Sequence, residues 1–124
     1  MATKISTNNA PAAIGPYSQA IVVGNTVYTS GQIAINPASG NIEAADVVGQ
    51  TEQVMKNLGA VLEAAGSSFE KAIKTTCFLA DIADFAAFNE VYGKYFTEKP
   101  ARSCVAAKAL PKGALVEVEV IAEI

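Results

Sequence analysis

The segment RSCVAAKALPKGALVEVEV, residues 102–120, gathers the side chains of this chain that could do chemistry. It holds Arg102, Cys104, Glu117 and Glu119, in a chain that contains no histidine. Without imidazole, the Ser-His-Asp and Cys-His nucleophile systems and most zinc and iron sites are excluded. Any catalysis would therefore depend on guanidinium, carboxylate, thiol, phenol and backbone groups acting with water.

Two strands are predicted in this segment. The first covers Ala101–Ala107. The second begins at Val116, where apolar residues alternate with glutamates, which is the period of a strand with one buried face. A turn at Pro111–Gly113 would join them as a hairpin with Val105 opposite Val118, because that register matches apolar with apolar side chains.

This register decides which polar side chains meet. It places Arg102 and Cys104 on the same face as Glu117 and Glu119. A slip of one residue would turn Arg102 to the valine side, where an unpaired charge is costly. Two interpretations remain open: a solvated cross-strand ion pair worth about 0 to 1 kcal/mol, or an arginine that binds a small carboxylate beside a glutamate that moves protons.

A tight hairpin is predicted near the N-terminus. Two β-branched runs, 17–23 and 26–33, flank Gly24-Asn25, a two-residue turn signal. This pairing places Tyr17 and Ser30 on one face. Each has a structural alternative, Tyr17 as an interface or core aromatic residue and Ser30 as an ordinary strand position.

The two cysteines, Cys77 and Cys104, form no CxxC pair, so neither a zinc site nor a disulfide framework is indicated and a reducing compartment is expected. Without a histidine or lysine partner, the Cys104 thiol should stay mostly protonated. A packed small residue therefore competes with a nucleophile as its interpretation. Cys77, inside an apolar strand, is predicted to lie in the core.

The remaining elements are two helices and a buried strand. Apolar residues recur at helical spacing from Asp46 to Ala65, with Gly66 placed as the C-terminal cap. KAIKTTCFLA, residues 71–80, predicts the strand. A second helix, capped by Asp84, is predicted from four aromatic residues: Phe85, Phe88, Tyr92 and Phe96. The order of elements predicts an α+β fold in which two helices cover one face of a mixed sheet.

Length and composition bound the possible functions. The 124 residues fit a single domain, 1–124. Hydrophobic residues make up 51% and charged residues 17%, so part of the apolar surface could be covered by other copies of the chain. A net charge of −3 argues against a nucleic-acid partner. The N-terminus lacks a signal-peptide core and no apolar run is long enough to span a membrane, so a soluble, cytoplasmic protein is expected.

Three long motifs carry a family resemblance: APAAIGPYSQAI, YTSGQIAINPASGNI and PARSCVAAKALPKGALVEVEVIAEI. In this order, and over nearly the whole chain, they resemble the Rid family of reactive intermediate deaminases, also called YjgF-like proteins. The resemblance implies a chorismate-mutase-like α+β sandwich assembled as a homotrimer, with sites in clefts between subunits. It also implies hydrolysis of reactive 2-imino acids and enamines, such as 2-aminoacrylate and 2-iminobutanoate, to 2-oxo acids and ammonia, with no metal or organic cofactor.

The same resemblance implies roles for residues in matching motifs. Glu117 in VEVEV and Cys104 in RSC are implied as catalytic. The implied substrate-binding residues are Arg102, Tyr17, Ser30, Gly31 and Asn89. The segment YFTEKPARS is shorter than in the best-known members, which leaves the preferred size of the substrate side chain open.

Two alternative functions remain open. Some similar proteins are described as ribonucleases or translation inhibitors, an activity that the acidic composition and the missing histidine argue against. A trimer that binds small carboxylates without catalysis is the second rival.

Overall fold

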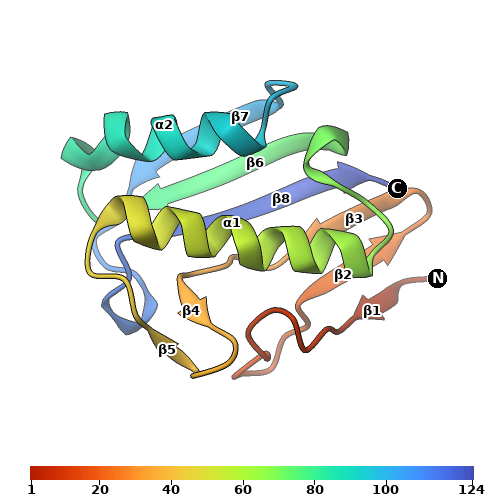
Figure 1. Cartoon of the computed structure of the whole chain (residues 1–124). Helices are drawn as coiled ribbons and strands as arrows, with labels where there is room; N and C mark the ends of the chain where they lie inside the picture. Colours follow the sequence, from red (N-terminus) through yellow and green to blue (C-terminus); the bar gives the residue numbers. More distant parts are fainter.

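Apolar side chains that alternate along the strands build a six-stranded sheet, and the computed structural model describes all of residues 1–124. The strands lie in the order β1-β2-β3-β8-β6-β7 (Figure 1). Their bounds are β1 (Thr3–Ile5), β2 (Ala20–Val23), β3 (Thr26–Thr29), β6 (Ala72–Leu79), β7 (Ala101–Ala106) and β8 (Val116–Glu123). A separate small hairpin pairs β4 (Ile35–Asn36) with β5 (Asn41–Ile42).

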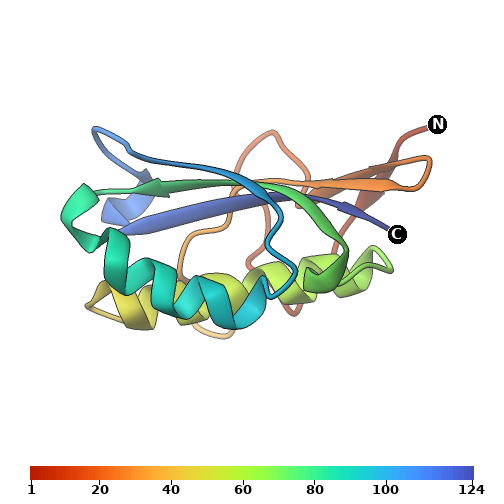
Figure 2. The same cartoon turned by 90° about the horizontal axis from the view of Figure 1, so that it is seen from above.

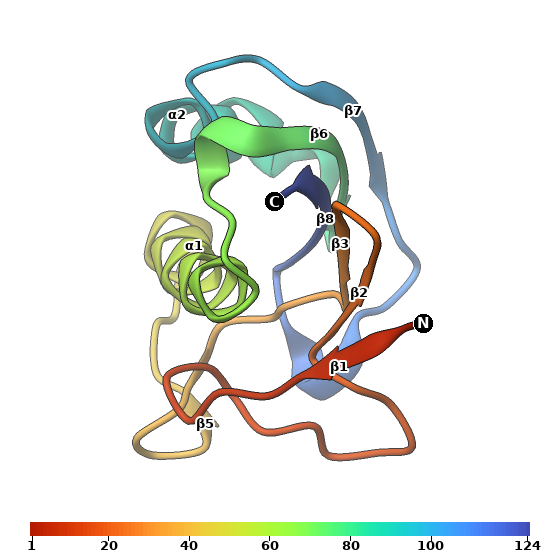
Figure 3. The same cartoon turned by 90° about the vertical axis from the view of Figure 1, so that its right-hand side faces the viewer.

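Two helices, α1 (Val47–Ala64) and α2 (Phe85–Tyr95), pack side by side on one face of the sheet (Figures 2 and 3). The core lies between these layers and contains 18 buried residues. Its sheet side is centred on β8, where the valines alternate with half-buried glutamates as predicted. Neither helix has the length and continuous apolar character needed to span a membrane.

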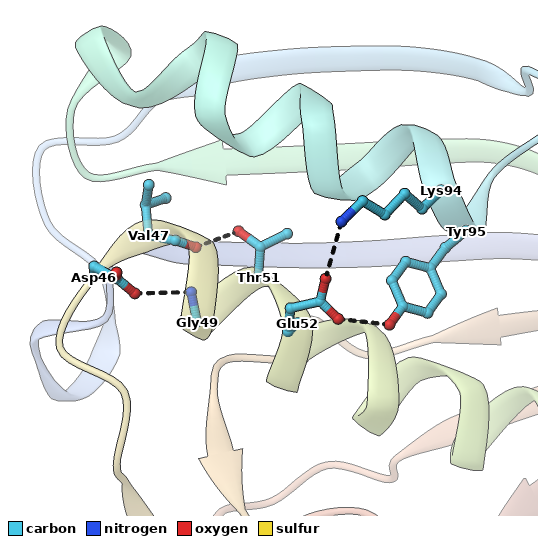
Figure 4. Close-up of polar contacts among 7 residues, drawn as sticks. All are labelled: Asp46, Val47, Gly49, Thr51, Glu52, Lys94 and Tyr95. Atoms are coloured by element: carbon cyan, nitrogen blue, oxygen red, sulfur yellow. Dashed lines mark hydrogen bonds and ion pairs between the residues drawn. The ribbon is translucent and has the colours of Figure 1, made fainter.

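Helix α1 begins and ends where the sequence predicts. The Asp46 carboxylate accepts a hydrogen bond of 2.8 Å from the Gly49 amide and so caps the first turn (Figure 4). Gly66 follows the helix with a φ of +82°, the left-handed conformation that favours glycine at this position.

The two helices are joined by polar contacts across their interface. The Tyr95 hydroxyl donates a 2.7 Å hydrogen bond to one carboxylate oxygen of Glu52 (Figure 4). Lys94 Nζ lies 3.9 Å from the other oxygen. Glu52 on α1 therefore holds two consecutive residues of α2.

The start of α2 differs from the prediction, because the Asp84 side chain makes no capping hydrogen bond. A 3₁₀ turn, η2 (Ile82–Asp84), precedes the helix instead. The carboxylate that caps this turn belongs to Asp81 and accepts from the Ala83 amide at 2.9 Å. The α-helix itself begins at Phe85, the first residue of the aromatic pattern, directly after this 3₁₀ turn.

The predicted N-terminal hairpin is confirmed in its turn and register. Gly24 has a φ of +58°, and Ile21 lies opposite Tyr28, the register that a two-residue turn at Gly24-Asn25 requires. The strands are shorter than predicted, so Tyr17 lies in the loop before β2.

The predicted hairpin between β7 and β8 is wrong. β7 pairs in parallel with β6, and β8 pairs antiparallel with the other edge of β6. Val105 therefore lies opposite Phe78 rather than Val118. The physical reason is α2: a helix that connects two strands is the crossover that parallel pairing requires, so β7 returns beside β6.

This pairing also turns Arg102 and Cys104 to the face opposite the predicted one, whereas Glu117 and Glu119 keep theirs. Arg102 lies in line with Thr75 and Val120, on the face that the helices cover. Glu117 lies in line with Phe78 on the opposite face. A charge on the helix side is tolerated because β7 is the edge strand, where α2 supplies partners for the guanidinium.

The other face of the sheet has no helix over it (Figure 2). Several large apolar side chains point to this face from β2, β3 and β7. Val23, Tyr28 and Val105 keep 48%, 47% and 49% of their surface exposed. Exposed apolar side chains on one sheet face are typical of a surface that binds another protein chain.

Candidate functional site

Arg102 is held by α2 without being neutralised. Its Nη1 donates a 2.7 Å hydrogen bond to Oδ1 of Asn89. The guanidinium carbon lies 4.8 Å from the ring centre of Tyr92 and 5.4 Å from that of Phe85, both cation–π distances. No carboxylate forms an ion pair with this half-buried arginine. Its remaining N–H groups suit a planar anion such as a carboxylate.

A hollow of about 320 Å³ lies beside this guanidinium. Its lining includes Asn89, Tyr92, Phe96, Lys99, Pro100 and Arg102. The hollow is open to solvent on the edge of the molecule formed by α2 and β7, so a small anion could reach the arginine.

Cys104 lies on the same face of β7 as Arg102, directly opposite Cys77 of β6. Burial raises the pKa of the Cys104 thiol, and the opposing effect of Arg102 does not cancel that rise. Burial also raises the pKa of Cys77, to about 12. Both thiols are therefore protonated near neutral pH, which argues against a thiolate nucleophile.

A second hollow, of about 370 Å³, gathers the other predicted site residues. Tyr17, Ser30, Gly31 and Glu117 all line it. Burial raises the pKa of the Glu117 carboxyl, and the neighbouring Glu119 raises it further. A carboxyl group with a raised pKa can both accept and return a proton closer to neutrality than an ordinary glutamate.

Gly31 makes room for this carboxyl group. A Cβ atom placed on Gly31 would overlap Oε2 of Glu117 and would lie 2.9 Å from its Cδ. A bulge is an ordinary reason for a glycine in a strand, whereas at Gly31 the structure shows a close approach of backbone to side chain.

Ser30 and Tyr17 shape the wall of the second hollow. The Ser30 hydroxyl donates a 2.5 Å hydrogen bond to the Ser18 carbonyl, which fixes the end of the loop that carries Tyr17. Tyr17 is 48% exposed and lies at the rim. Ser30 therefore positions this wall in addition to lining it.

Two buried amides that support the second hollow were not predicted. Gln19 donates to the carbonyls of Ala10 and Pro11, and so anchors the N-terminal loop. Asn57 donates to the carbonyls of Ile33 and Ile35, which follow Gly31. Asn57 could have been found from the sequence, because it lies beside Leu58 on the apolar side of a helix, where a buried polar group needs hydrogen-bond partners.

The two hollows do not meet within one chain. Arg102, Asn89 and Cys104 lie on the helix side at the β7 edge, and neither of these two hollows contains both Arg102 and Glu117. No cluster of His, Cys, Asp and Glu side chains is grouped closely enough to hold a metal ion. The hollow beside Arg102 and the hollow beside Glu117 therefore lie on separate surfaces of the chain.

Comparisons with known proteins agree with this architecture. The sequence profile of the family described as Endoribonuclease L-PSP matches residues 7–124. The chain is 52% identical over 122 residues to the RutC family protein y4sK of Sinorhizobium fredii, covering 98% of this chain and 97% of that one. It is 50% identical over 119 residues to the 2-iminobutanoate/2-iminopropanoate deaminase of Mus musculus, covering 95% and 88%.

The fold is similar to that of E. coli TdcF solved with bound serine, with a TM-score of 0.94, 44% identity and 98% of both chains covered. The predicted α+β fold is confirmed, and it is the chorismate-mutase-like fold of its structural neighbours. Because the family profile covers nearly all of the chain and relatives share about half of its residues, the chain belongs to the Rid family, also called the YjgF or L-PSP family.

Proposed function

We propose that the chain hydrolyses small reactive 2-imino acids, such as 2-iminobutanoate and the imine form of 2-aminoacrylate, to 2-oxo acids and ammonia. The observation that carries this proposal is the half-buried Arg102 guanidinium, which is oriented by Asn89 and has no carboxylate partner. A small anionic substrate would supply that partner. The mammalian relatives named as 2-iminobutanoate/2-iminopropanoate deaminases support the substrate class.

Arg102 would bind the substrate carboxylate through two parallel N–H···O bonds. Asn89 occupies one guanidinium nitrogen, and the rings of Tyr92 and Phe85 limit how the guanidinium can turn. The bound serine of TdcF, a small molecule with a carboxylate, supports a ligand of this size. With the carboxylate fixed, the C=N carbon has a defined position for attack.

Glu117 would act as the general acid/base. It takes a proton from water as the oxygen bonds to the C=N carbon and passes that proton to the nitrogen, which gives a tetrahedral carbinolamine. Glu117 then takes the hydroxyl proton as the C=O bond forms and delivers it to the nitrogen as the C–N bond breaks, so ammonia leaves and Glu117 is again a carboxylate. The raised pKa of Glu117 suits both directions of transfer. Cys104 would contribute its backbone and its packing, because its thiol is protonated.

The site would be shared between copies of the chain. In one chain Arg102 and Glu117 lie on different faces, so a second copy is needed to bring a Glu117 hollow to an Arg102 hollow. The sheet face without a helix offers the contact surface for that copy. A homotrimer closed by rotational symmetry would make every such junction equivalent and give each chain one complete site with a neighbour.

The direct test generates 2-iminobutanoate with a threonine dehydratase and follows its lifetime by trapping with semicarbazide. We expect the protein to shorten the lifetime of the imine, Arg102→Ala to lose nearly all of this effect, and Cys104→Ala to retain appreciable activity. Equal losses in the two variants would count against the mechanism. If the wild-type protein binds 2-oxobutanoate but does not accelerate hydrolysis, the chain is a carboxylate-binding module and the proposal is wrong.

A further inference from the structure

The hollow beside Arg102 contains a second cation. Lys99 lines it together with Arg102, and neither side chain forms an ion pair with any carboxylate of the chain. The adjacent Glu98 does not line the hollow. Two positive charges without partners therefore face one small space, which is more than the carboxylate of a simple 2-imino acid can neutralise.

The backbone places Lys99 there in an unusual conformation. Its φ is +53°, in the left-handed region that residues other than glycine, asparagine and aspartate rarely adopt. It also precedes Pro100, and the residue before a proline is normally extended. Its amide is held by the Phe96 carbonyl at 3.3 Å. Strained residues concentrate at ligand-binding sites, and this one lies beside the arginine that lacks a carboxylate partner.

The rest of the lining suits a short carbon chain between two anionic ends. Tyr92 and Phe96 form the buried apolar floor beneath the guanidinium, and Asn89 fixes the guanidinium on one side. Within one chain, no acidic side chain is among the residues that line the hollow, so the chain's own lining does not repel a second carboxylate. The charge and the lining together favour a dianion over a monoanion.

We infer that this chain prefers 2-imino dicarboxylates, the imines formed when aspartate or glutamate is oxidised at Cα. Arg102 binds the carboxylate next to the C=N group, and Lys99 binds the carboxylate of the side chain. This inference rests on the proposed function for its reaction, but its ligand preference can be measured separately. Lys99 is then the residue that determines substrate charge.

The experiment compares imines of aspartate and of asparagine, generated by amino-acid oxidases, because the second is the neutral counterpart of the first. We expect a higher kcat/KM for the aspartate imine. Lys99→Ala should reduce this selectivity about threefold to fivefold at low salt, mainly through KM, since the lysine is exposed. Lys99→Arg should keep the selectivity, and Lys71→Ala, which removes an exposed lysine outside the hollow, should not change it.

Lys99→Gly removes the same charge while allowing the left-handed backbone, so it separates charge from strain. It should behave like Lys99→Ala in selectivity. If both variants keep the wild-type selectivity, or if the asparagine imine is the better substrate of the wild-type protein, the inference is overturned.

Calorimetric titration with 2-oxoglutarate and 2-oxobutanoate distinguishes failure of this inference from failure of the proposed function. Tighter binding of 2-oxoglutarate that depends on Lys99 would support the ligand preference even if no imine were hydrolysed. Rapid hydrolysis of 2-iminobutanoate with equal binding of both 2-oxo acids, unchanged by Lys99→Ala, would leave the proposed function intact and overturn the preference.

Discussion

Gly31 provides the space in which the Glu117 carboxyl group lies. A methyl group at position 31 would overlap Oε2 of Glu117 and would approach its Cγ to 3.0 Å. Because Glu117 is half-buried in the second hollow, it has little room to retreat without changing the position of the carboxyl group. The glycine thus fixes the position of this carboxyl group.

Gly31→Ala should therefore displace Glu117 and lower kcat/KM for 2-iminobutanoate by about 100-fold, the scale of a lost general acid/base. Combining Gly31→Ala with Glu117→Gln tests the cause. If the glycine acts through the carboxyl group, the double variant should be no slower than Glu117→Gln alone. Independent, multiplying losses would show that Gly31 acts through another contact.

The pH dependence of the reaction should report Glu117. Burial and then Glu119 raise its pKa in the folded chain, so the basic carboxylate is lost at a higher pH than for an ordinary glutamate as the solution is acidified. Glu119→Gln removes one negative neighbour and should lower the pKa of Glu117. The acidic limb of the kcat/KM profile should then move to lower pH with the same substrate. An unmoved limb would indicate that another group titrates.

The raised pKa of Glu117 also affects the stability of the folded chain. Acid lowers activity through this group, whereas it favours folding. A carboxyl group whose pKa is raised by folding stabilises the folded chain fully below its unfolded pKa and loses that contribution as pH rises through the raised value. Glu117→Gln should therefore unfold at a higher denaturant concentration than the wild-type protein near neutral pH, with the difference shrinking in acid.

Local sequence patterns predicted the helices and strands better than they predicted which strands pair with one another. The span 46–65 and the alternation from Val116 are set by spacing within one segment, and the structure confirms both. The partner of residues 101–106 depends on segments far apart in the chain. Pro111–Gly113 suggested a hairpin, but these residues carry the chain past the end of β6 instead of joining paired strands.

The candidate site shows the same limit. Spacing grouped Arg102 with Glu117 and Glu119 but left a solvated ion pair open, and the family resemblance selected Arg102 and Glu117 as site residues. Their separation onto two faces follows from the parallel pairing of β7, which a one-dimensional register argument could not supply. Gly31 was named by its motif, yet its role became visible only when the Glu117 side chain was placed against it.

The contact between α1 and α2 should depend more on Tyr95 than on Lys94. Tyr95 donates a 2.7 Å hydrogen bond to Glu52, whereas Lys94 is 3.9 Å away with its side chain 67% exposed. Tyr95→Phe should lower the free energy of unfolding by about 1 to 2 kcal/mol. Lys94→Ala should lower it by less than about 0.5 kcal/mol. Urea denaturation of both variants checks this order, and a larger loss for Lys94→Ala would contradict it.

A site that takes Arg102 from one chain and Glu117 from another makes a prediction that no single-chain site shares. Arg102→Ala and Glu117→Gln should each be inactive alone. Coexpressed in equal amounts, they should recover about a quarter of the wild-type activity, because that fraction of junctions pairs an intact arginine with an intact glutamate. The control for dilution of active chains is a chain that carries both Arg102→Ala and Glu117→Gln. It is coexpressed with Cys104→Ala, the variant expected to retain activity. The mixed Arg102→Ala and Glu117→Gln chains could instead be no more active than the sum of the two separate variants. That result would place each site within one chain and would remove the need for a second copy.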